Sequence, residues 1–331
     1  MLRTNPLELL DIDDYTSLRV ALDGCFRKRR VLITGATGFL GPYVIAAGLA
    51  LGADMHALAM ENGIPGVKSW PVRVEDRRVV SEVVSSIRPE AVLHLAAAGV
   101  TYGSSSIAEL LTVNVAGLDS LLTAISEEGA CPVVVAGSAF EYAPKKRAIA
   151  ETDEIGPVTA YGISKAAATL TARLYAGRMP ITLLRIFNAF GAGEREPRLL
   201  PYIVARAKQG LPTDLTPGEQ VRDYVYAGDV AECFWRILAT PPVSGRLRLL
   251  NVGSGKTVIL REFVEEIASE LSDRGLAASP SFGARPYRSD EVMFYVPRVE
   301  RLRDILGWLP ACDIKHNIGC TIDWFLSHGC S

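Results

Sequence analysis

The sequence predicts an α/β fold in which a doubly wound parallel sheet is followed by a smaller, mostly helical lobe. Three observations lead to this prediction. Short runs of continuous apolar residues alternate with helix-like stretches, a glycine-rich turn follows the first run, and beyond Gly191 proline and glycine become frequent while apolar runs become sparse. Continuous apolar runs are typical of parallel strands that helices cover on both faces. We therefore expect a first domain at 29–190, a strand at about 246–254 that completes its sheet, and the lobe mainly at 191–331.

The residues before the first apolar run have a different character. Residues 1–28 are polar and mixed in composition, and they end in the basic run at 27–30. We expect an appended helical arm whose role the sequence does not reveal. This stretch has no apolar segment of the signal-peptide type, and no run in the chain approaches the ~18 apolar residues of a membrane helix. We therefore expect a cytoplasmic protein.

The periodicity of the apolar residues places the remaining elements. Strands are expected at 31–33, 55–60, 72–74, 91–95, 132–136 and 181–186, and a further strand at 249–252 returns to the main sheet. Helices are expected in the stretch that ends at residue 51 and at 77–87, 107–126 and 160–175. Because helices separate the strands, the strands pair in parallel through crossovers.

Composition and charge exclude several classes of protein. Of the 331 residues 49% are hydrophobic and 22% charged, which is ordinary for a soluble globular chain. Lys and Arg number 35 against 37 Asp and Glu, so the net charge of -2 provides no excess for holding nucleic acid or an anionic membrane. The six cysteines are dispersed without a C-x-x-C pair and the four histidines are scattered, which indicates neither a disulfide framework nor a metal site.

A glycine-rich turn follows the first predicted strand. Gly35, Gly38 and Gly41 are spaced by three residues between that strand and the first apolar helix. In such a turn the first glycine permits the tight bend, the second admits a pyrophosphate to the backbone amides, and the third lets the helix pack on the strand. The helix N-terminus then faces the anion. This turn predicts a dinucleotide-binding domain of the Rossmann type.

A second group of residues suggests acid/base chemistry. Tyr161 and Lys165 are four residues apart at the start of a predicted helix, so the phenol and the ammonium share one face. A cation beside a phenol favours phenolate, and we expect Lys165 to lower the pKa of Tyr161. Ser138 follows the fifth apolar run, at the edge where a parallel sheet presents its functional residues.

Together these segments resemble the extended short-chain dehydrogenase/reductase family, in its NAD-dependent sugar-nucleotide epimerase, dehydratase and reductase branch. The resemblance runs from about Arg30 to the C-terminus. It includes T-G-A-T-G-F-L-G (34–41), H-L-A-A (94–97), Asn114, G-S-A-F-E-Y (137–142), Y-G-I-S-K (161–165), R-I-F-N (185–188), V-R-D-Y-V-Y (221–226), N-V-G-S-G (251–255) and L-G-W-L-P (306–310).

The resemblance implies roles for these residues. Tyr161 would be the general acid/base, Lys165 would support it and hold the nicotinamide ribose, and Ser138 would hydrogen-bond the reacting sugar oxygen. The cofactor would contact Gly35, Thr37, Gly38, Phe39, Leu40, Gly41, Glu61, Leu95, Ala96, Ala97, Asn114, Tyr161 and Lys165. The substrate would contact Ser138, Asn188, Arg222 and Arg288, with Arg285 a less favoured choice than Arg288. The partner is thus a nucleotide-diphosphate sugar, and we expect a homodimer.

Two departures from the family pattern narrow the reaction. Dehydratases of the family have Asp-Glu directly after the Ser or Thr, and sugar-acid decarboxylases have Glu two residues after it; here Ala139 and Phe140 occupy these positions. Neither elimination nor decarboxylation is expected. Glu141 before Tyr142 resembles the 4-keto-6-deoxysugar reductases, so we expect an NAD(P)-dependent reductase of a nucleotide-activated 4-keto sugar.

Two alternatives stay open. An epimerase at C4 or a neighbouring carbon would use the same three residues and return the hydride to a rotated keto sugar. A non-catalytic nucleotide-binding protein of the same fold is the third hypothesis. The intact Ser138, Tyr161 and Lys165 argue against it.

The nucleotide end of the site favours NAD, with NADP as the alternative. Glu61 is the nearest acid to the end of the second strand, and it is expected to bind the ribose hydroxyls. No Arg or Lys occurs at 59–63 to meet a 2′-phosphate, although Arg73 stands where relatives place an adenine-contacting Asp.

Two other signals are discounted. The G-S-G-K-T run at 253–257 has Leu250 where a P-loop needs glycine, so we read it as a helix-initiating turn, and His94 is read as a structural imidazole.

Overall fold

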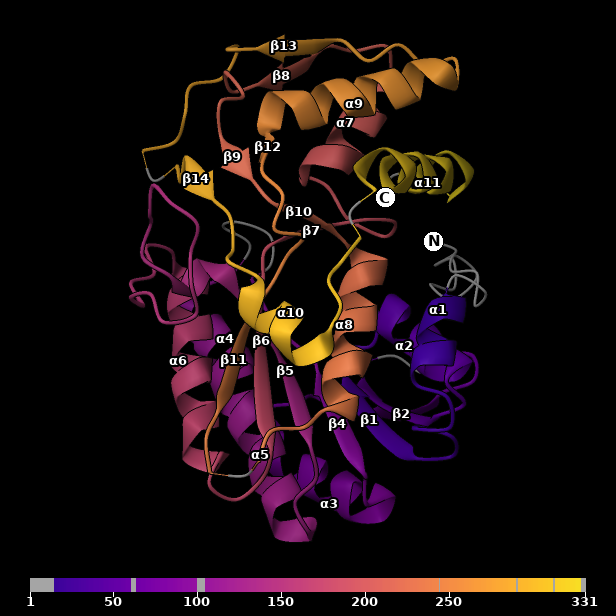
Figure 1. Cartoon of the computed structure of the whole chain (residues 1–331), viewed down its shortest axis with the longest axis vertical. Helices are drawn as coiled ribbons and strands as arrows, with labels where there is room; N and C mark the ends of the chain where they lie inside the picture. Colours follow the sequence, from indigo (N-terminus) through magenta and orange to yellow (C-terminus); the bar gives the residue numbers. More distant parts are fainter. Residues whose placement is uncertain are drawn as a thin grey trace.

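The computed structural model describes residues 15–60, 64–99, 105–243, 245–289, 291–311 and 313–328. Figure 1 shows two parts: a sheet flanked by helices, and a smaller lobe built around α7, α9 and α11 at the other end of the molecule. The sheet is a seven-stranded parallel sheet in the order β11-β6-β5-β4-β1-β2-β3. Its strands are β1 Arg30–Thr34, β2 Asp54–Ala59, β3 Lys68–Pro71, β4 Ala91–His94, β5 Val133–Ser138, β6 Ile181–Ile186 and β11 Arg248–Val252. The predicted doubly wound fold is confirmed.

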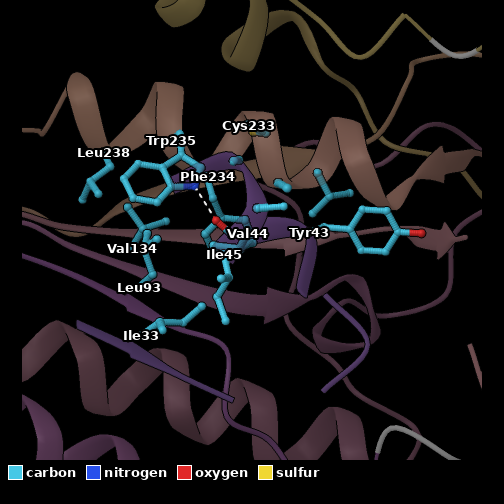
Figure 2. Close-up of a cluster of buried hydrophobic side chains, with 14 of the residues drawn as sticks. Ile33, Tyr43, Val44, Ile45, Leu93, Val134, Cys233, Phe234, Trp235 and Leu238 are labelled. Carbon is cyan, nitrogen blue, oxygen red and sulfur yellow. Dashed lines mark hydrogen bonds between the residues drawn. The ribbon is translucent and has the colours of Figure 1, made fainter. Parts of the chain in front are cut away.

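Helices cover both faces of this sheet, as the continuous apolar runs predict. One face carries α2 Gly41–Ala50, α8 Ala227–Ala239 and α10 Glu300–Leu306. The other carries α3 Arg77–Ile87, α5 Gly117–Glu128 and α6 Ala160–Tyr175. In Figure 2, Trp235 of α8 lies against α2, where its indole Nε1 donates to the carbonyl oxygen of Val44 at 2.8 Å. The indole is fully buried and meets Phe26 edge-on, with ring centroids 4.9 Å apart.

The expected strand at 72–74 is wrong by a few residues. The strand there is β3, and Val72 and Val74 follow it as buried side chains of the core beside α3 and α5. Within the described residues β3 pairs with β2 alone, and Lys68 at its start forms an ion pair with Asp54 at 2.9 Å. A polar start suits an edge strand, which carries the charges that a central strand excludes.

The helix expected at 107–126 has three parts: α4 Ile107–Leu111, the π-helical turn η3 Thr112–Ala116, and α5. The stretch 107–128 is long and apolar enough in composition to span a membrane. It packs inside the fold, where Leu118, Leu121 and Leu122 of α5 are fully buried against the sheet and α3.

The described part of the N-terminal arm is not simply appended. It holds the short helix α1 Thr16–Ala21, and Leu18 and Phe26 are buried in the core beneath the sheet. The hydroxyl of Tyr15 donates to the carbonyl oxygen of Tyr43 in α2 at 3.1 Å. Residues 1–14 lie outside the described part.

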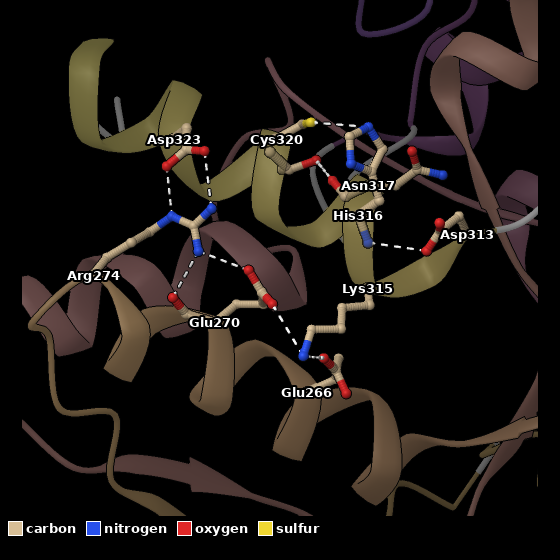
Figure 3. Close-up of polar contacts among 10 residues, drawn as sticks. Glu266, Glu270, Arg274, Asp313, Lys315, His316, Asn317, Cys320 and Asp323 are labelled. Atoms are coloured by element: carbon tan, nitrogen blue, oxygen red, sulfur yellow. Dashed lines mark hydrogen bonds and ion pairs between the residues drawn. The ribbon is translucent and has the colours of Figure 1, made fainter.

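The smaller lobe is mainly helical, as predicted, with short strands at its edges. Its helices are α7 Leu199–Lys208, α9 Leu260–Asp273 and α11 Ile314–His328. Its strands pair as β7 Asn188–Phe190 with β10 Tyr224–Tyr226, β8 Thr213–Leu215 with β13 Pro280–Phe282, and β9 Val221–Arg222 with both β12 Val258–Ile259 and β14 Phe294–Tyr295. Figure 3 shows Arg274, after α9, paired with Asp323 of α11 at 2.5 Å and with Glu270 at 2.7 Å. These ion pairs fix α11 against α9.

Candidate active site

One cavity of about 490 Å³ opens at the carboxyl ends of the strands. The order of the sheet reverses at β1, where β4 lies on one side and β2 on the other, and doubly wound sheets bind ligands at such a point. The predicted site residues that line the cavity are Gly35, Thr37, Gly38, Phe39, Leu40, Gly41, Leu95, Ala96, Ala97, Ser138, Tyr161, Lys165 and Asn188. Asn114, Arg222 and Arg288 do not line it, and Glu61 lies outside the described residues.

The glycine-rich turn forms a cradle at one end of the cavity. Gly35 has a φ of +72°, and a Cβ there would lie 2.6 Å from the backbone nitrogen of Ala96. A Cβ on Gly41, the first residue of α2, would lie 2.6 Å from the carbonyl oxygen of Gly35. The first turn of α2 holds no acidic residue, so its N-terminal amides face an anion without competition. This cradle fits the pyrophosphate of a dinucleotide.

The adenosine end of the cavity lies beyond β2. Met60 is 57% exposed there, and Arg73 and Glu75 line the wall. The Arg73 guanidinium forms an ion pair with the Glu75 carboxylate at 3.3 Å. Because the cation already has a carboxylate partner, this pairing opposes its use for a 2′-phosphate.

The predicted catalytic residues come together on one wall. Ser138 ends β5, and Tyr161 and Lys165 lie in the first turns of α6, which Thr159 caps by accepting from the Gly162 amide at 3.0 Å. The side chains of Tyr161 and Ser138 share a hydrogen bond. The Lys165 ammonium is buried and donates to the carbonyl oxygen of Ala136 at 2.5 Å.

The expectation that Lys165 lowers the pKa of Tyr161 is not met. Burial raises the pKa of Tyr161 to about 12, against the opposing effect of its hydrogen bond with Ser138. Burial also lowers the pKa of Lys165 to about 8. The reason for the difference is that the Lys165 ammonium bonds to the main chain of β5. Tyr161 is therefore a neutral phenol at physiological pH.

Two buried polar residues support the wall from behind. Asn114, expected to contact the cofactor, lies in η3, where it accepts from the Ala98 amide at 2.8 Å and donates to the Ser164 hydroxyl at 2.8 Å. It thus joins the loop after β4 to α6. His94 shares a 2.8 Å hydrogen bond with the Thr34 hydroxyl, and burial lowers the pKa of His94 to about 3. His94 is a neutral structural imidazole, as the sequence suggested.

The predicted phosphate-binding arginines meet at one carboxylate. Glu291 pairs with Arg222 at 2.9 Å and with Arg288 at 3.6 Å. Asn188, which lines the cavity, donates to the carbonyl oxygen of Asp223, the residue after Arg222, at 3.1 Å. The two arginines therefore lie close together next to the lobe side of the cavity.

The G-S-G-K-T run at 253–257 is a turn that precedes β12 and α9. The Asp223 carboxylate accepts from the amides of Ser254 and Gly255, at 2.9 and 2.6 Å. The amides of this turn are thus occupied by a protein carboxylate, in keeping with the reading as a helix-initiating turn.

Several cavity residues escaped the sequence analysis as contributors to the site. Phe140, Phe187 and Tyr295 form an aromatic wall, with ring centroids 5.4 Å apart for Phe140 and Tyr295 and 5.2 Å apart for Phe187 and Tyr295. The buried Tyr295 hydroxyl has no hydrogen-bond partner within the described ranges. Arg198 also lines the cavity, beside Phe39 and paired with the buried Glu194 at 2.5 Å. Phe140 and Phe187 lie in two of the motifs quoted above, whereas Arg198 and Tyr295 lie in none, so no local sequence signal groups these residues at one site.

The chain belongs to the NAD dependent epimerase/dehydratase family, whose model matches residues 31–253. This assignment agrees with the extended short-chain dehydrogenase/reductase resemblance, and NAD is the cofactor. Its relatives include sugar-nucleotide epimerases and dehydratases, so the chain is an enzyme of this class.

Individual relatives span nearly the whole chain. The UDP-glucose 4-epimerase of Lacticaseibacillus casei is 26% identical, covering 90% of this chain and 97% of its own. The CDP-abequose synthase of Salmonella typhimurium is 26% identical, covering 88% and 97%. Among solved structures, the Thermus thermophilus UDP-glucose 4-epimerase in complex with NAD is 28% identical, with a TM-score of 0.77 and coverage of 90% and 99%.

Proposed function

We propose that the protein is a reductase that uses the reduced nicotinamide cofactor to reduce a nucleotide-activated 4-keto sugar. The observation that carries the proposal is the placement of Ser138, Tyr161 and Lys165 on one wall of the cavity, which the aromatic side chains of Phe140 and Tyr295 also line. A neutral phenol is a proton donor, which is the role that reduction of a carbonyl requires. Epimerisation begins with the same residue acting as a base, so Tyr161 alone serves either reaction, and the side chains around it favour reduction.

The residues have the following roles in this proposal. When bound, the reduced nicotinamide supplies hydride to the carbonyl carbon. Tyr161 donates its proton to the developing alkoxide, and Ser138 hydrogen-bonds the same oxygen. The Ser138 hydroxyl oxygen already accepts from the Phe140 amide at 3.2 Å, which fixes its orientation. Lys165 holds the nicotinamide ribose and keeps a positive charge near the phenol.

The aromatic wall supports reduction over epimerisation. Phe140 packs beside the Tyr161 ring, with 6.2 Å between the ring centroids, and Tyr295 packs against Phe140 on the same wall. A keto sugar must rotate within the site during epimerisation, and rings on this side restrict the rotation. Ala139 and Phe140 also leave the catalytic turn without the acid that elimination requires.

We also propose how the substrate is bound and where the enzyme acts. Arg222 and Arg288 share the single carboxylate of Glu291, so this pair keeps an excess positive charge for a diphosphate, and Asn188 contacts the sugar side. The site is thus suited to a nucleotide-diphosphate sugar. Cys25, Cys131, Cys233 and Cys320 form no disulfide, which agrees with a cytoplasmic enzyme.

The test is stoichiometric. Purified protein is incubated with a panel of nucleotide-activated keto sugars and reduced cofactor, and the absorbance of the cofactor is followed beside product formation. We expect one cofactor to be oxidised per product. The Tyr161→Phe variant should lose turnover by ~100-fold or more with little change in NAD binding, since it keeps the ring and loses the proton. Product formation without net cofactor consumption would establish the epimerase instead.

We further propose a homodimer formed through α4 and α6. These helices pack together and expose large apolar side chains: Ile107, Leu111, Ile163, Leu170 and Leu174, with Leu174 75% exposed. Such a stripe is suited to helix packing against a second copy. The Leu170→Glu/Leu174→Glu variant should elute as a monomer in light-scattering chromatography, whereas Val20→Glu, at a site in α1 that is 77% exposed, should not change the mass. A wild-type monomer at micromolar concentration would refute the dimer.

A further inference from the structure

A buried carboxylate lies directly beneath the catalytic wall. Glu141, in the short 3₁₀ helix η4 (Ala139–Glu141), folds its side chain back to accept from the Ser138 amide at 3.0 Å. The other carboxylate oxygen accepts from the Thr169 hydroxyl at 2.7 Å and from Nε of Arg185 at 2.9 Å. Glu141 therefore joins three elements, since Ser138 ends β5, Thr169 lies in α6 and Arg185 lies in β6.

The ion pair is a poor source of stability. Both side chains are 0% exposed, so each charge is fully removed from water. Nη1 and Nη2 of Arg185 are buried and have no hydrogen-bond partner in the part of the chain that the structure describes. The guanidinium lies over the Tyr142 ring, 4.4 Å from its centroid, and this contact offsets only part of the cost of burying the charge. When apolar side chains of similar volume replace a buried ion pair that has unmet hydrogen bonds, the protein is commonly as stable as before or more stable.

The contacts of the pair lead to the reacting residues. Ser138 and Glu141 cap each other, because Glu141 accepts from the Ser138 amide while the Ser138 hydroxyl oxygen accepts from the Phe140 amide. Thr169 lies one helical turn beyond Lys165 on α6, the helix that also carries Tyr161. One carboxylate thus ties the strand that carries the serine to the helix that carries the tyrosine and the lysine.

We propose that Glu141 and Arg185 are positioning residues that hold Ser138 in register with Tyr161 and Lys165. This inference rests on the proposed function of those three residues. The pair does not line the cavity and acts on the reaction only through its neighbours. In the sequence, Glu141 is only a mark of the resemblance to reductases, and Arg185 is only a member of the R-I-F-N motif.

The charge of Glu141 gives the pair a signature that a purely structural contact lacks. Burial lowers the pKa of Lys165 to about 8, and the Glu141 carboxylate opposes this by raising it. The groups that face this region from the surrounding elements are Ser138, Tyr142, Tyr161, Thr169, Arg185, Arg198, Tyr295 and His94. His94 stays neutral, since its pKa is about 3. Loss of the Glu141 charge should therefore move the pKa of Lys165 further down.

The main experiment removes the whole pair. The Glu141→Met/Arg185→Met variant replaces both charges with flexible apolar side chains, and its thermal unfolding midpoint should stay within about 5 °C of wild type. Its kcat should fall by ~10- to 100-fold with KM changed by less than about threefold, because the bound sugar is retained while the catalytic geometry loosens. The alkaline fall in activity should also begin at lower pH. The pH dependence of NAD affinity, measured by calorimetry, should shift in the same direction without any turnover.

A second pair of variants keeps the inference testable if the double variant does not fold. Thr169→Val removes one donor to Glu141 with little change in shape, and kcat should fall by about 3- to 10-fold. Thr169→Ser restores the hydroxyl and should restore kcat. The inference would be overturned if the folded double variant kept the wild-type kcat and an unshifted pH profile. It would also be overturned if Thr169→Val did so. The absence of wild-type turnover on every nucleotide sugar would instead refute the proposed function, so the two failures are distinguishable.

Discussion

Replacement of Gly41 by alanine tests how the chain holds the cofactor pyrophosphate. A Cβ at this position would lie 2.6 Å from the carbonyl oxygen of Gly35 and closer still to that of Ala36. Ordinary contact begins near 3.4 Å, and the obstacle is backbone, so the start of α2 must move by roughly 1 Å. An amide displaced by that amount no longer reaches an oxygen at ~2.9 Å. Loss of one charge-assisted hydrogen bond costs ~1.5–3 kcal/mol, so NAD affinity should fall by about 10- to 150-fold.

The assay is calorimetric titration of NAD into Gly41→Ala, with Gly177→Ala as the matched control. Gly177 follows α6, and a Cβ there would meet no atom within 4 Å. The control should therefore bind NAD as the wild type does. If Gly41→Ala keeps wild-type affinity while it remains folded by circular dichroism, the close approach of α2 to the glycine turn does not position the pyrophosphate site, and the argument fails.

Three further predictions concern the substrate, the cofactor and pH. Arg222→Ala should weaken sugar-nucleotide binding by ~1.5–3 kcal/mol without changing NAD affinity, and a calorimetric loss on the cofactor side would show that the two sites are wrongly assigned. Glu75→Ala frees Arg73 from its partner, so the affinity for NADP should rise by about threefold or more relative to the affinity for NAD. If the ratio of the two affinities does not change, Arg73 does not reach the 2′-phosphate. The pKa of His94 is about 3 in the folded protein and 6.5 in the unfolded chain, so below pH 6.5 only the unfolded chain binds this proton. The free energy of unfolding should therefore fall by up to about 1.4 kcal/mol for each pH unit below 6.5. Urea denaturation of wild type and His94→Asn should show a weaker acid dependence in the variant, and parallel pH curves would contradict this.

The sequence predicted best the elements whose pattern is local. The helix at 77–87 has its boundaries at the expected residues because Asp76 caps it and its apolar residues recur with helical spacing. The helix at 160–175 was placed equally well, with Thr159 as its cap. The strand expected at 72–74 was displaced because burial of Val72 and Val74 comes from contacts with distant helices and not from pairing.

The candidate site was predictable only where a motif occurs. The glycine turn, Ser138, Tyr161 and Lys165 follow a recognisable spacing, and they line one cavity. Tyr295 could not be found in this way, because it reaches the wall through long-range folding of the lobe. The pairing of the Lys165 ammonium with a backbone carbonyl was also beyond the sequence, since it depends on how closely α6 packs on β5.

The return of the chain to the sheet as β11 has a consequence for biosynthesis. β6 ends at Ile186, but its outer neighbour β11 spans Arg248–Val252, and the segments that hold the lobe helix α7 and the sheet-covering helix α8 are made in between. At ~5–20 residues per second, a ribosome takes roughly 3 to 13 s to add these residues. During that interval β6 has an uncovered edge of unpaired amides and carbonyls on an apolar strand. The nascent chain therefore passes through a stage in which its dinucleotide domain is almost complete and most exposed to aggregation, and a chaperone that binds extended apolar strands would act at this stage.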